Sequence, residues 1–322
     1  VIISIAASLV EGYTFEDLAD TVKVYAYHLR TVEDCDVVVA SIHEYDSWTN
    51  QAIAGFTGNY RVDAIFNGHT HQNQALIIER AGTDLPTAQI SNYSSSLLAK
   101  ITLIYDRETG LIVEPEDPYT MVQTLSDSNF SSTDSAINTI IDTYAHDEVY
   151  LNFIKEDLVT TEAYYDRYDL APWGASVIRD YLGIDVGFVN AGGFRVTMES
   201  GTLTMGELVT IYPFDNVIKT SQLTGYQLND FCDTIESNDI IPDQDAYCYG
   251  GTFYIDGSPV NGSTLYTVGA VDYIFDKTYY MFLQGQNITQ TVYFMRDLLA
   301  IDLRNNTDSY FNPANGTSYP QA

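Results

Sequence analysis

Short β-branched apolar runs alternate with stretches of helical spacing at the start of the chain, and this order limits the fold more than any other feature. The apolar runs cover residues 1–7, 36–41 and 62–66, and the helical stretches cover 15–30 and 47–58. Parallel strands need a crossover of a dozen or more residues, usually a helix, so the alternation predicts a parallel α/β sheet. Ligands gather at the carboxyl ends of such strands, where His43 and His69 fall.

The pattern changes after residue 75. Short runs separated by turn residues predict antiparallel strands that close the first domain, at 76–78, 87–90 and 100–105. The acidic, proline-containing segment 114–118 and the polar stretch 126–135 predict a linker. Residues 137–154 then have the spacing of one long helix.

A second domain is predicted beyond this helix. Its pattern predicts a strand at 186–189 and helices at 173–182, 223–235 and 289–301, followed by a polar, asparagine-rich tail. At 322 residues the chain is long enough for two cores. We expect domains at 1–118 and 159–322, joined by a linker and an interdomain helix at 119–158.

The charge balance excludes two classes of partner. The 14 basic and 44 acidic residues give a net charge of -30, which repels nucleic-acid backbones and anionic membrane surfaces. A nucleic-acid polymer is therefore not expected as a partner. A small anionic substrate is compatible if the few arginines are concentrated at its site and a metal offsets the local carboxylates.

Cysteine and sequon usage is informative about the compartment. Cys35, Cys232 and Cys248 are too few for a disulfide framework, and either one Cys232–Cys248 bridge or reduced thiols fit the sequence. Asn-x-Ser/Thr sequons begin at Asn92, Asn129, Asn261, Asn287, Asn305 and Asn315. They favour an extracellular, periplasmic or cell-surface protein. No apolar run is long enough to span a membrane, and the first residues lack the order of a signal peptide.

Two motifs indicate chemistry. Gly-His-Thr-His at 68–71 follows an apolar run, and His43 follows an earlier one. An isolated His-x-His most often caps a strand, but the strand, the glycine and His43 together favour a metal site. Asn-Ala-Gly-Gly-Phe-Arg at 190–195, followed by Tyr-Pro-Phe-Asp-Asn at 212–216, supplies an arginine, amides and a ring. An arginine can bind a phosphate or ribose hydroxyl through two donors, so these residues predict phosphate chemistry on a nucleotide.

With these motifs in this order, the chain resembles the 5'-nucleotidase family of the metallophosphoesterase superfamily. That family's catalytic domain ends in Gly-His-x-His, and its second domain contains Asn-x-Gly-Gly-x-Arg. The earlier family motifs, Asp-x-His, Gly-Asp and Gly-Asn-His-Asp/Glu, have no counterpart in this sequence. The resemblance implies a partial metallophosphoesterase α/β sandwich, without about half of the catalytic domain, joined by a helix to a 5'-nucleotidase C-terminal-type α/β domain.

The resemblance also implies roles for individual residues. His43 and His69 would bind one divalent metal ion, Zn or Mn, and His71 a second, in a two-metal site that is incomplete in this chain. Substrate binding would involve Arg167, Asn190, Gly193, Arg195, Phe214, Asn216, Gly251 and Tyr273. Phe214 and Tyr273 would stack on the base. The family's Gly-Gly-Asp is missing after Tyr273, which leaves nucleoside selectivity open. We expect Arg179 to lie on a solvated helix face, and His28 and His146 to lie within helices.

Three functions are compatible with the resemblance. The first is a metal-dependent phosphoric monoester hydrolase of the 5'-nucleotidase type, converting nucleotides to nucleoside and phosphate. The second is a non-catalytic nucleotide-binding or cell-surface protein derived from that family. The third is one piece of a split enzyme, in which an N-terminal fragment completes the catalytic domain by pairing with the predicted strand at 1–7.

Overall fold

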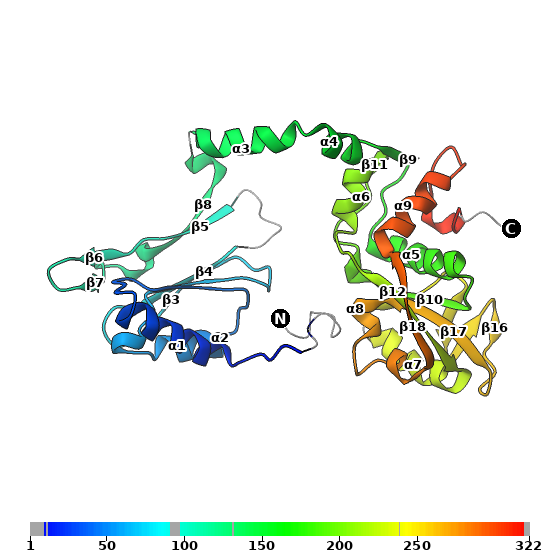
Figure 1. Cartoon of the computed structure of the whole chain (residues 1–322), viewed down its shortest axis with the longest axis horizontal. Helices are drawn as coiled ribbons and strands as arrows, with labels where there is room; N and C mark the ends of the chain where they lie inside the picture. The colour runs from blue at the N-terminus through cyan, green and yellow to red at the C-terminus, as the bar shows by residue number, and fades with distance from the viewer. Residues whose placement is uncertain (1–9, 11, 91–96, 131, 238, 319–322) are drawn as a thin grey trace. The chain divides into compact units, whose positions relative to one another are not determined.

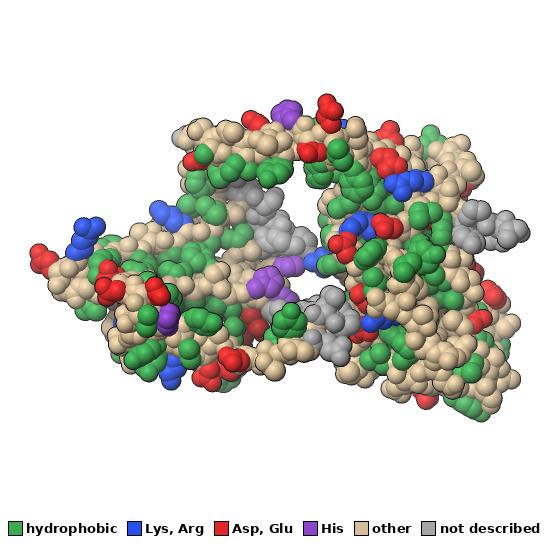
Figure 2. Space-filling model, viewed as in Figure 1, with side chains coloured by type: hydrophobic (Ala, Val, Ile, Leu, Met, Phe, Trp, Pro, Cys, Tyr) green, Lys and Arg blue, Asp and Glu red, His purple; other side chains and the backbone are tan. Residues whose placement is uncertain are grey.

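The computed structural model describes residues 10, 12–90, 97–130, 132–237 and 239–318. The chain divides into two compact units, one containing Gly12–Asn138 and the other Thr139–Ala322 (Figure 1). The predicted strand at 1–7 and the sequon at Asn92 lie outside the described residues. Figure 2 shows acidic side chains scattered over the visible face of both units, with few basic ones among them.

The first unit contains a four-stranded sheet in the order β1-β2-β4-β3. Its strands are β1 (Val39–Ile42), β2 (Ala64–Asn67), β3 (Gln74–Ile78) and β4 (Leu85–Gln89). The pairs β1–β2 and β2–β4 are parallel, and β3 is antiparallel to β4. Helices α1 (Leu18–Thr31) and α2 (Ser47–Ala54) lie together on one face, and the short helix η3 (Gly58–Tyr60) precedes β2 (Figure 1). The predicted parallel α/β arrangement is confirmed.

The core of this unit is small and has a partly buried ion pair at its edge. Side chains from α1, α2 and the sheet form it, among them Ile53 and Ile65, both with no exposed surface. The Arg30 guanidinium lies 2.5 Å from Asp63 Oδ2, and the same oxygen accepts the Val38 N–H at 2.9 Å. The pair therefore ties α1 to the amino end of the parallel sheet.

Two hairpins follow this sheet. β5 (Leu97–Ile101) pairs with β8 (Val122–Ser126), and β6 (Ile104–Asp106) pairs with β7 (Leu111–Val113), both antiparallel. The short helices η4 (Pro118–Met121) and η5 (Asp127–Asn129) flank β8. The run predicted at 100–105 is therefore not one strand, because it is divided between β5 and β6.

The prediction of a single helix at 137–154 is also wrong. The chain forms α3 (Ser135–Ala145) and α4 (Glu148–Ile154) instead. Asp147 begins the second helix because its carboxylate accepts the Tyr150 N–H at 2.8 Å, an N-cap that stops α3 from continuing. His146 lies between the helices, with Nδ1 2.6 Å from the Asp142 carbonyl oxygen.

The second unit is built on a five-stranded mixed sheet in the order β13-β10-β17-β12-β18. Its strands are β10 (Val186–Asn190), β12 (Val217–Thr224), β13 (Ile240–Pro242), β17 (Leu265–Val271) and β18 (Gln286–Phe294). Helices α5 (Arg167–Leu182) and α9 (Met295–Asn305) lie on one face and α7 (Gly225–Ser237) on the other (Figure 1). The mixed α/β character of both units confirms the predicted fold class.

Smaller elements complete this unit. A two-stranded sheet pairs β9 (Asp157–Thr161) with β11 (Gly201–Thr204), and a three-stranded sheet contains β14 (Ala246–Tyr249), β15 (Thr252–Ile255) and β16 (Ser258–Pro259). The remaining helices are η6 (Ala191–Gly193), α6 (Met205–Ile211), α8 (Asp272–Phe275), η7 (Met281–Gln284) and η8 (Pro313–Asn315).

Helix α5 packs directly on β10 at a glycine. Its start is fixed by a capping box between Asp166 and Asp169, and its end by Gly183 at a φ of 61°. A Cβ atom on Gly187 of β10 would lie 2.0 Å from the Ala175 carbonyl oxygen, so only glycine allows this approach. The close contact sets how near α5 lies to β10.

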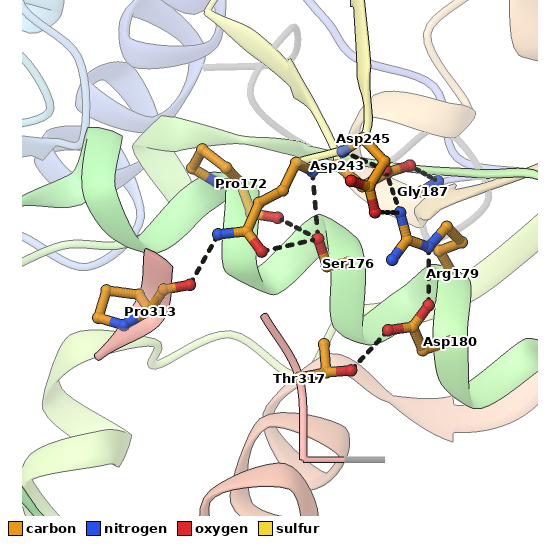
Figure 3. A network of polar contacts seen from close by, with 10 residues as sticks. Pro172, Ser176, Arg179, Asp180, Gly187, Asp243, Asp245, Pro313 and Thr317 are labelled. Atoms are coloured by element: carbon orange, nitrogen blue, oxygen red, sulfur yellow. Dashed lines mark hydrogen bonds and ion pairs between the residues drawn. The ribbon is translucent and has the colours of Figure 1, made fainter. Parts of the chain in front are cut away.

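Arg179 forms a partly buried ion cluster, so the predicted solvated position for it is wrong (Figure 3). Its guanidinium lies 2.6 Å from Asp243 and from Asp245, and 2.7 Å from Asp180. Asp243 is buried and also accepts the Gly187 N–H at 3.0 Å. The cluster therefore joins α5, β10 and the turn that precedes β14.

The residues predicted as a helix at 289–301 form a strand for nearly half of that range. Strand β18 runs to Phe294, and α9 starts only at Met295. The sequence from Ile288 to Phe294 is rich in threonine, valine and aromatic residues, which favour strands. Hydrogen bonding to β12 then stabilises the strand over the predicted helix.

Cys232 and Cys248 form a disulfide, with their Cα atoms 5.6 Å apart. This settles the choice that the sequence left open, and it links α7 to β14. Cys35 has a free thiol. No helix within the described ranges is long and apolar enough to cross a membrane.

Candidate functional site

The predicted metal-binding histidines follow two adjacent strands of the first unit. β1 and β2 are parallel with Ile42 opposite Asn67, so His43 and Gly68 come next at the same carboxyl edge. The rings of His43 and His69 lie with centroids 5.4 Å apart. A Cβ atom on Gly68 would lie 3.1 Å from His43 Nδ1, so the glycine leaves room for this imidazole.

The loop that contains the histidines has an uncommon backbone. His69 and His71 have φ values of 74° and 56°, in the left-handed region that few non-glycine residues adopt. Such outliers cluster at functional sites. Burial, together with the charges of His43 and His71, lowers the pKa of His69 and favours its neutral form.

These histidines do not by themselves make a metal centre. Among the residues that the structure describes, no group of three or more histidine, cysteine or carboxylate side chains is arranged to hold a metal ion. Two imidazoles at a strand edge have the right donor chemistry, but they are fewer than the donors of a closed site. The roles of His43, His69 and His71 in metal binding therefore stay predictions.

A second cluster forms at one edge of the sheet in the second unit. β10 and β17 are parallel with Phe188 opposite Ala270, so Asn190 lies level with Asp272. β12 is antiparallel to β17 with Ile218 opposite Val271, so its first residues reach the same edge. The chain therefore brings together segments about 80 residues apart at the carboxyl ends of two parallel strands, where α/β sheets bind ligands.

Arg195 lies at the centre of this cluster. It follows the turn of η6 and is anchored by its own N–H, which donates to the Ile211 carbonyl oxygen at 2.7 Å. Its guanidinium donates to the Gly192 carbonyl oxygen at 3.3 Å and lies 5.9 Å from the centroid of the Phe214 ring. The predicted arginine and the predicted stacking ring are thus in contact.

The turn before Arg195 packs tightly on a tyrosine. A Cβ atom on Gly193 would lie 2.9 Å from the buried ring of Tyr212. Any larger residue at this position of the motif would therefore clash with the ring. Tyr212 in turn stands edge-on to Phe214, with centroids 6.1 Å apart. Phe214 itself is 41% exposed, which is unusual for a core phenylalanine and suits a ring that contacts a ligand.

Asn216 is held by a short polar chain. The Tyr212 hydroxyl donates to Asn216 Oδ1 at 3.1 Å, and Asn216 Nδ2 donates to Asp272 Oδ1 at 2.7 Å. Burial raises the pKa values of both Tyr212 and Asp272. Within the described ranges these bonds use the Asn216 oxygen and one of its two N–H groups, so the second N–H is available for the base contact that was predicted.

Tyr273 lies in helix α8 at the same edge. Burial raises the pKa of its hydroxyl, as does Tyr279, while the charge of Arg195 lowers it. The ammonium of Lys277 lies 4.6 Å from the Tyr273 centroid, a cation–π contact on one ring face.

Two predicted residues have other local explanations. Gly250 and Gly251 have φ values of 58° and 74° and form the two-residue turn between β14 and β15, which is a hairpin requirement. Arg167 is the first residue of α5, and no contact in the described part of the chain joins its side chain to Arg195 or Phe214. Their ligand-binding roles stay predictions.

Sequence reasoning missed two residues beside the cluster. Arg296, at the start of α9, forms an ion pair with Asp215 and donates to the Tyr212 carbonyl oxygen at 3.5 Å, so it braces the loop that contains Phe214. Asp239, between α7 and β13, accepts the Gly192 N–H at 3.0 Å. Neither residue has a sequence signal, because each is distant in sequence from its partner.

The fold and this edge cluster define a two-unit α/β protein with a candidate ligand site in its second unit. Residues 149–251 match the family model described as 5'-nucleotidase, C-terminal domain. The chain is therefore similar to the 5'-nucleotidases, and the match lies within its second unit. The predicted resemblance is confirmed.

Individual relatives agree with this assignment. The chain is 23% identical over 235 residues to the trifunctional nucleotide phosphoesterase protein YfkN of Bacillus subtilis, which is 69% of this chain and 15% of that protein. It is 23% identical over 255 residues to an apyrase of Tabanus yao, which is 66% of this chain and 43% of that protein. The chain thus spans less than half the length of either relative.

A solved structure supports the fold. The 5'-nucleotidase precursor from Thermus thermophilus aligns with a TM-score of 0.62 and 12% identity, covering 90% of this chain and 65% of its own. At this identity the alignment establishes the fold rather than the activity.

Proposed function

We propose that the second unit binds a nucleoside monophosphate for a 5'-nucleotidase-type phosphoesterase. The observation that supports this best is the position of Arg195. Its guanidinium contacts the Phe214 ring, and its charge acts on the Tyr273 hydroxyl, although the two rings come from different elements. A cation against an exposed aromatic ring, with a second ring at the same sheet edge, suits a ligand with a flat base and a polar sugar.

In this proposal each residue has a distinct role. Phe214 and Tyr273 stack on the base, and the free N–H of Asn216 reaches its edge. Asn190 and Arg195 bind the sugar side, and Gly193 lets the turn lie close to Tyr212. Because Lys277 already covers one face of the Tyr273 ring, the base stacks on the other face.

Hydrolysis would depend on the first unit. His43, His69 and His71 would contribute to a site for divalent ions, Zn or Mn, and bound ions would generate the nucleophile by lowering the pKa of water. The described residues do not complete such a site. Further metal ligands would then have to come from outside the described residues, for instance from an N-terminal fragment.

The second candidate function is nucleotide binding without hydrolysis. It requires only the second unit, where Arg195 contacts Phe214. Both candidates predict nucleotide binding, and only the first predicts phosphate release.

The test combines calorimetry with a phosphate-release assay on AMP, with Mn²⁺ or Zn²⁺ added. We expect wild-type binding and an affinity about ten- to hundredfold weaker for Arg195→Ala, because a charged hydrogen-bond donor is lost. Arg107→Ala is the matched control, since it removes an exposed arginine from the first unit. Phosphate release that is abolished in His69→Ala supports the hydrolase, whereas binding without release supports the second function. No binding of AMP by the wild type would contradict both.

We also propose an extracellular, periplasmic or cell-surface location. The Cys232–Cys248 disulfide is typical of oxidising compartments. The sequon asparagines within the described ranges are all exposed, namely Asn129, Asn261, Asn287, Asn305 and Asn315. Fractionation of the native source with a thiol-labelling assay tests this, because a reduced Cys232 in the native protein would contradict it.

A further inference from the structure

Asp239 lies beside the proposed nucleotide site and has no assigned role. It precedes β13, and the antiparallel register of β13 and β10 sets Ile240 opposite Asn190. The backbone there is closed by the Ala191 N–H, which donates to the Asp239 carbonyl oxygen at 3.1 Å. The sheet register therefore brings this aspartate to the sugar side of the proposed site.

The carboxylate of Asp239 is oriented but not neutralised. Its Oδ2 accepts the Gly192 N–H at 3.0 Å, which fixes the side chain against the glycine turn. Within the described part of the chain no hydrogen bond engages Oδ1 and no ion pair involves this carboxylate. The residue is exposed, so solvent or a ligand can reach the unused oxygen.

The backbone of Asp239 is also unusual. Its φ is 58°, in the left-handed region where a side chain costs free energy. Glycine would relieve this cost, and observed outliers of this kind are grounds for a functional hypothesis.

An amide donor lies close to the same point. A Cβ atom built on Gly192 would lie 3.6 Å from Asp239 Oδ2 and 3.5 Å from Asn190 Nδ2. The two side chains therefore flank the Gly192 turn, and the Gly192 carbonyl oxygen accepts from Arg195. A carboxylate acceptor and an amide donor beside an arginine suit a ribose, whose hydroxyls donate to carboxylates.

We propose that Asp239 is a specificity-determining residue that accepts hydrogen bonds from the ribose hydroxyls of the nucleotide. This rests on the proposed nucleotide binding and adds sugar selectivity to it. The site then distinguishes ribonucleotides from nucleotides that lack the sugar hydroxyls.

The experiment measures discrimination between two ligands by calorimetry. The wild type should bind AMP about ten- to hundredfold more tightly than 2',3'-dideoxy-AMP, because a charged acceptor loses its donors in the dideoxy compound. Asp239→Ala should bind both nucleotides equally and as weakly as the wild type binds the dideoxy compound. Asp239→Gly should behave in the same way, and it removes the carboxylate without backbone strain, so it guards against misfolding of the alanine variant.

Asp256→Ala is the matched control. Asp256 is exposed, has a φ of 50° and lies in the turn between β15 and β16, so its replacement has a similar backbone effect. It should leave the discrimination unchanged.

Three results would overturn the inference. If Asp239→Ala and Asp239→Gly weaken AMP and dideoxy-AMP by the same factor, Asp239 only supports the Gly192 turn. If the wild type binds AMP but does not discriminate, the ribose contact is wrong while the proposed function stands. If the wild type binds neither nucleotide, the proposed function fails and this inference fails with it.

Discussion

The stability of the second unit should depend on the protonation of one buried aspartate. Asp302 lies in α9 with no exposed surface, and its carboxylate accepts the Trp173 indole N–H at 2.9 Å and the Ser318 N–H at 2.7 Å. Burial raises its pKa from 3.8 to about 6 despite these two hydrogen bonds. Desolvation of the charged form therefore outweighs the hydrogen bonds that favour it.

The direction of the pH effect follows from this shift. Between about pH 4 and pH 6 the folded protein binds a proton at Asp302 that the unfolded chain has released. The free energy of unfolding therefore falls as the pH rises through this interval. A shift from 3.8 to about 6 corresponds to about 3 kcal/mol, of which about 2 kcal/mol should be seen between pH 4 and pH 7.

The perturbation is Asp302→Asn, which keeps the shape and removes the charge. Its unfolding free energy should be similar to that of the wild type at pH 4 and about 2 kcal/mol higher at pH 7. The assay is urea unfolding followed by the fluorescence of Trp173, which is fully buried. A Trp48→Phe background removes the other tryptophan, which is 83% exposed and lies in the first unit.

The control is Asp297→Asn, which removes a charge from an exposed position on the same helix. It should leave the pH dependence of the wild type in place. Parallel pH profiles for the wild type and Asp302→Asn would refute the reasoning, because they would mean that the carboxylate is not desolvated in the folded protein.

Three other predictions concern single contacts. Reduction of the Cys232–Cys248 disulfide, which closes a short loop with a sequence separation of 16, should lower the unfolding free energy of the second unit by about 3 kcal/mol in urea titrations with and without reductant. Gly193→Ala should weaken AMP binding in calorimetry by displacing the tyrosine ring behind it, whereas Gly192→Ala, whose nearest atoms are 3.5 Å away, should weaken it less. Arg179→Met should lower the unfolding free energy by about 3 kcal/mol because a buried aspartate loses its partner, and an unchanged urea midpoint would contradict this.

The spacing of apolar residues predicted a helix or strand correctly where only one spacing, helical or strand-like, is present. The run at 186–189 is apolar throughout and forms β10, buried on both faces, which is the pattern expected for a strand inside a covered sheet. The alternation before residue 67 predicted the parallel pairing of β1 and β2 because each crossover has enough residues for a helix. The prediction failed where both spacings are present. At 289–301 the apolar residues have helical spacing, but pairing with β12 makes the first residues a strand.

Some residues of the candidate site were predictable from the sequence and others were not. Asn190, Arg195, Phe214 and Asn216 come from one stretch of chain whose motifs are visible in the sequence, and the structure brings Arg195 and Phe214 into contact. The supporting residues are not visible in the sequence, because their partners are set by the sheet. Asp239 reaches Gly192 through the register of β13 with β10, at a separation of 47 residues.

If Asp239 contacts the ribose as proposed, the sheet register would let sugar selectivity change while the Asn-x-Gly-Gly-x-Arg motif stays intact. The glycine turn at 191–193 is held both by its own strand and by whichever side chain the neighbouring strand β13 brings to it. A substitution at 239 would therefore change the hydrogen-bond acceptor beside the glycine turn without changing the Asn-x-Gly-Gly-x-Arg sequence. We therefore expect residue 239, which precedes β13, to determine the discrimination between ribose and dideoxyribose. Asp239→Gly tests this, because it changes residue 239 and leaves the motif unchanged.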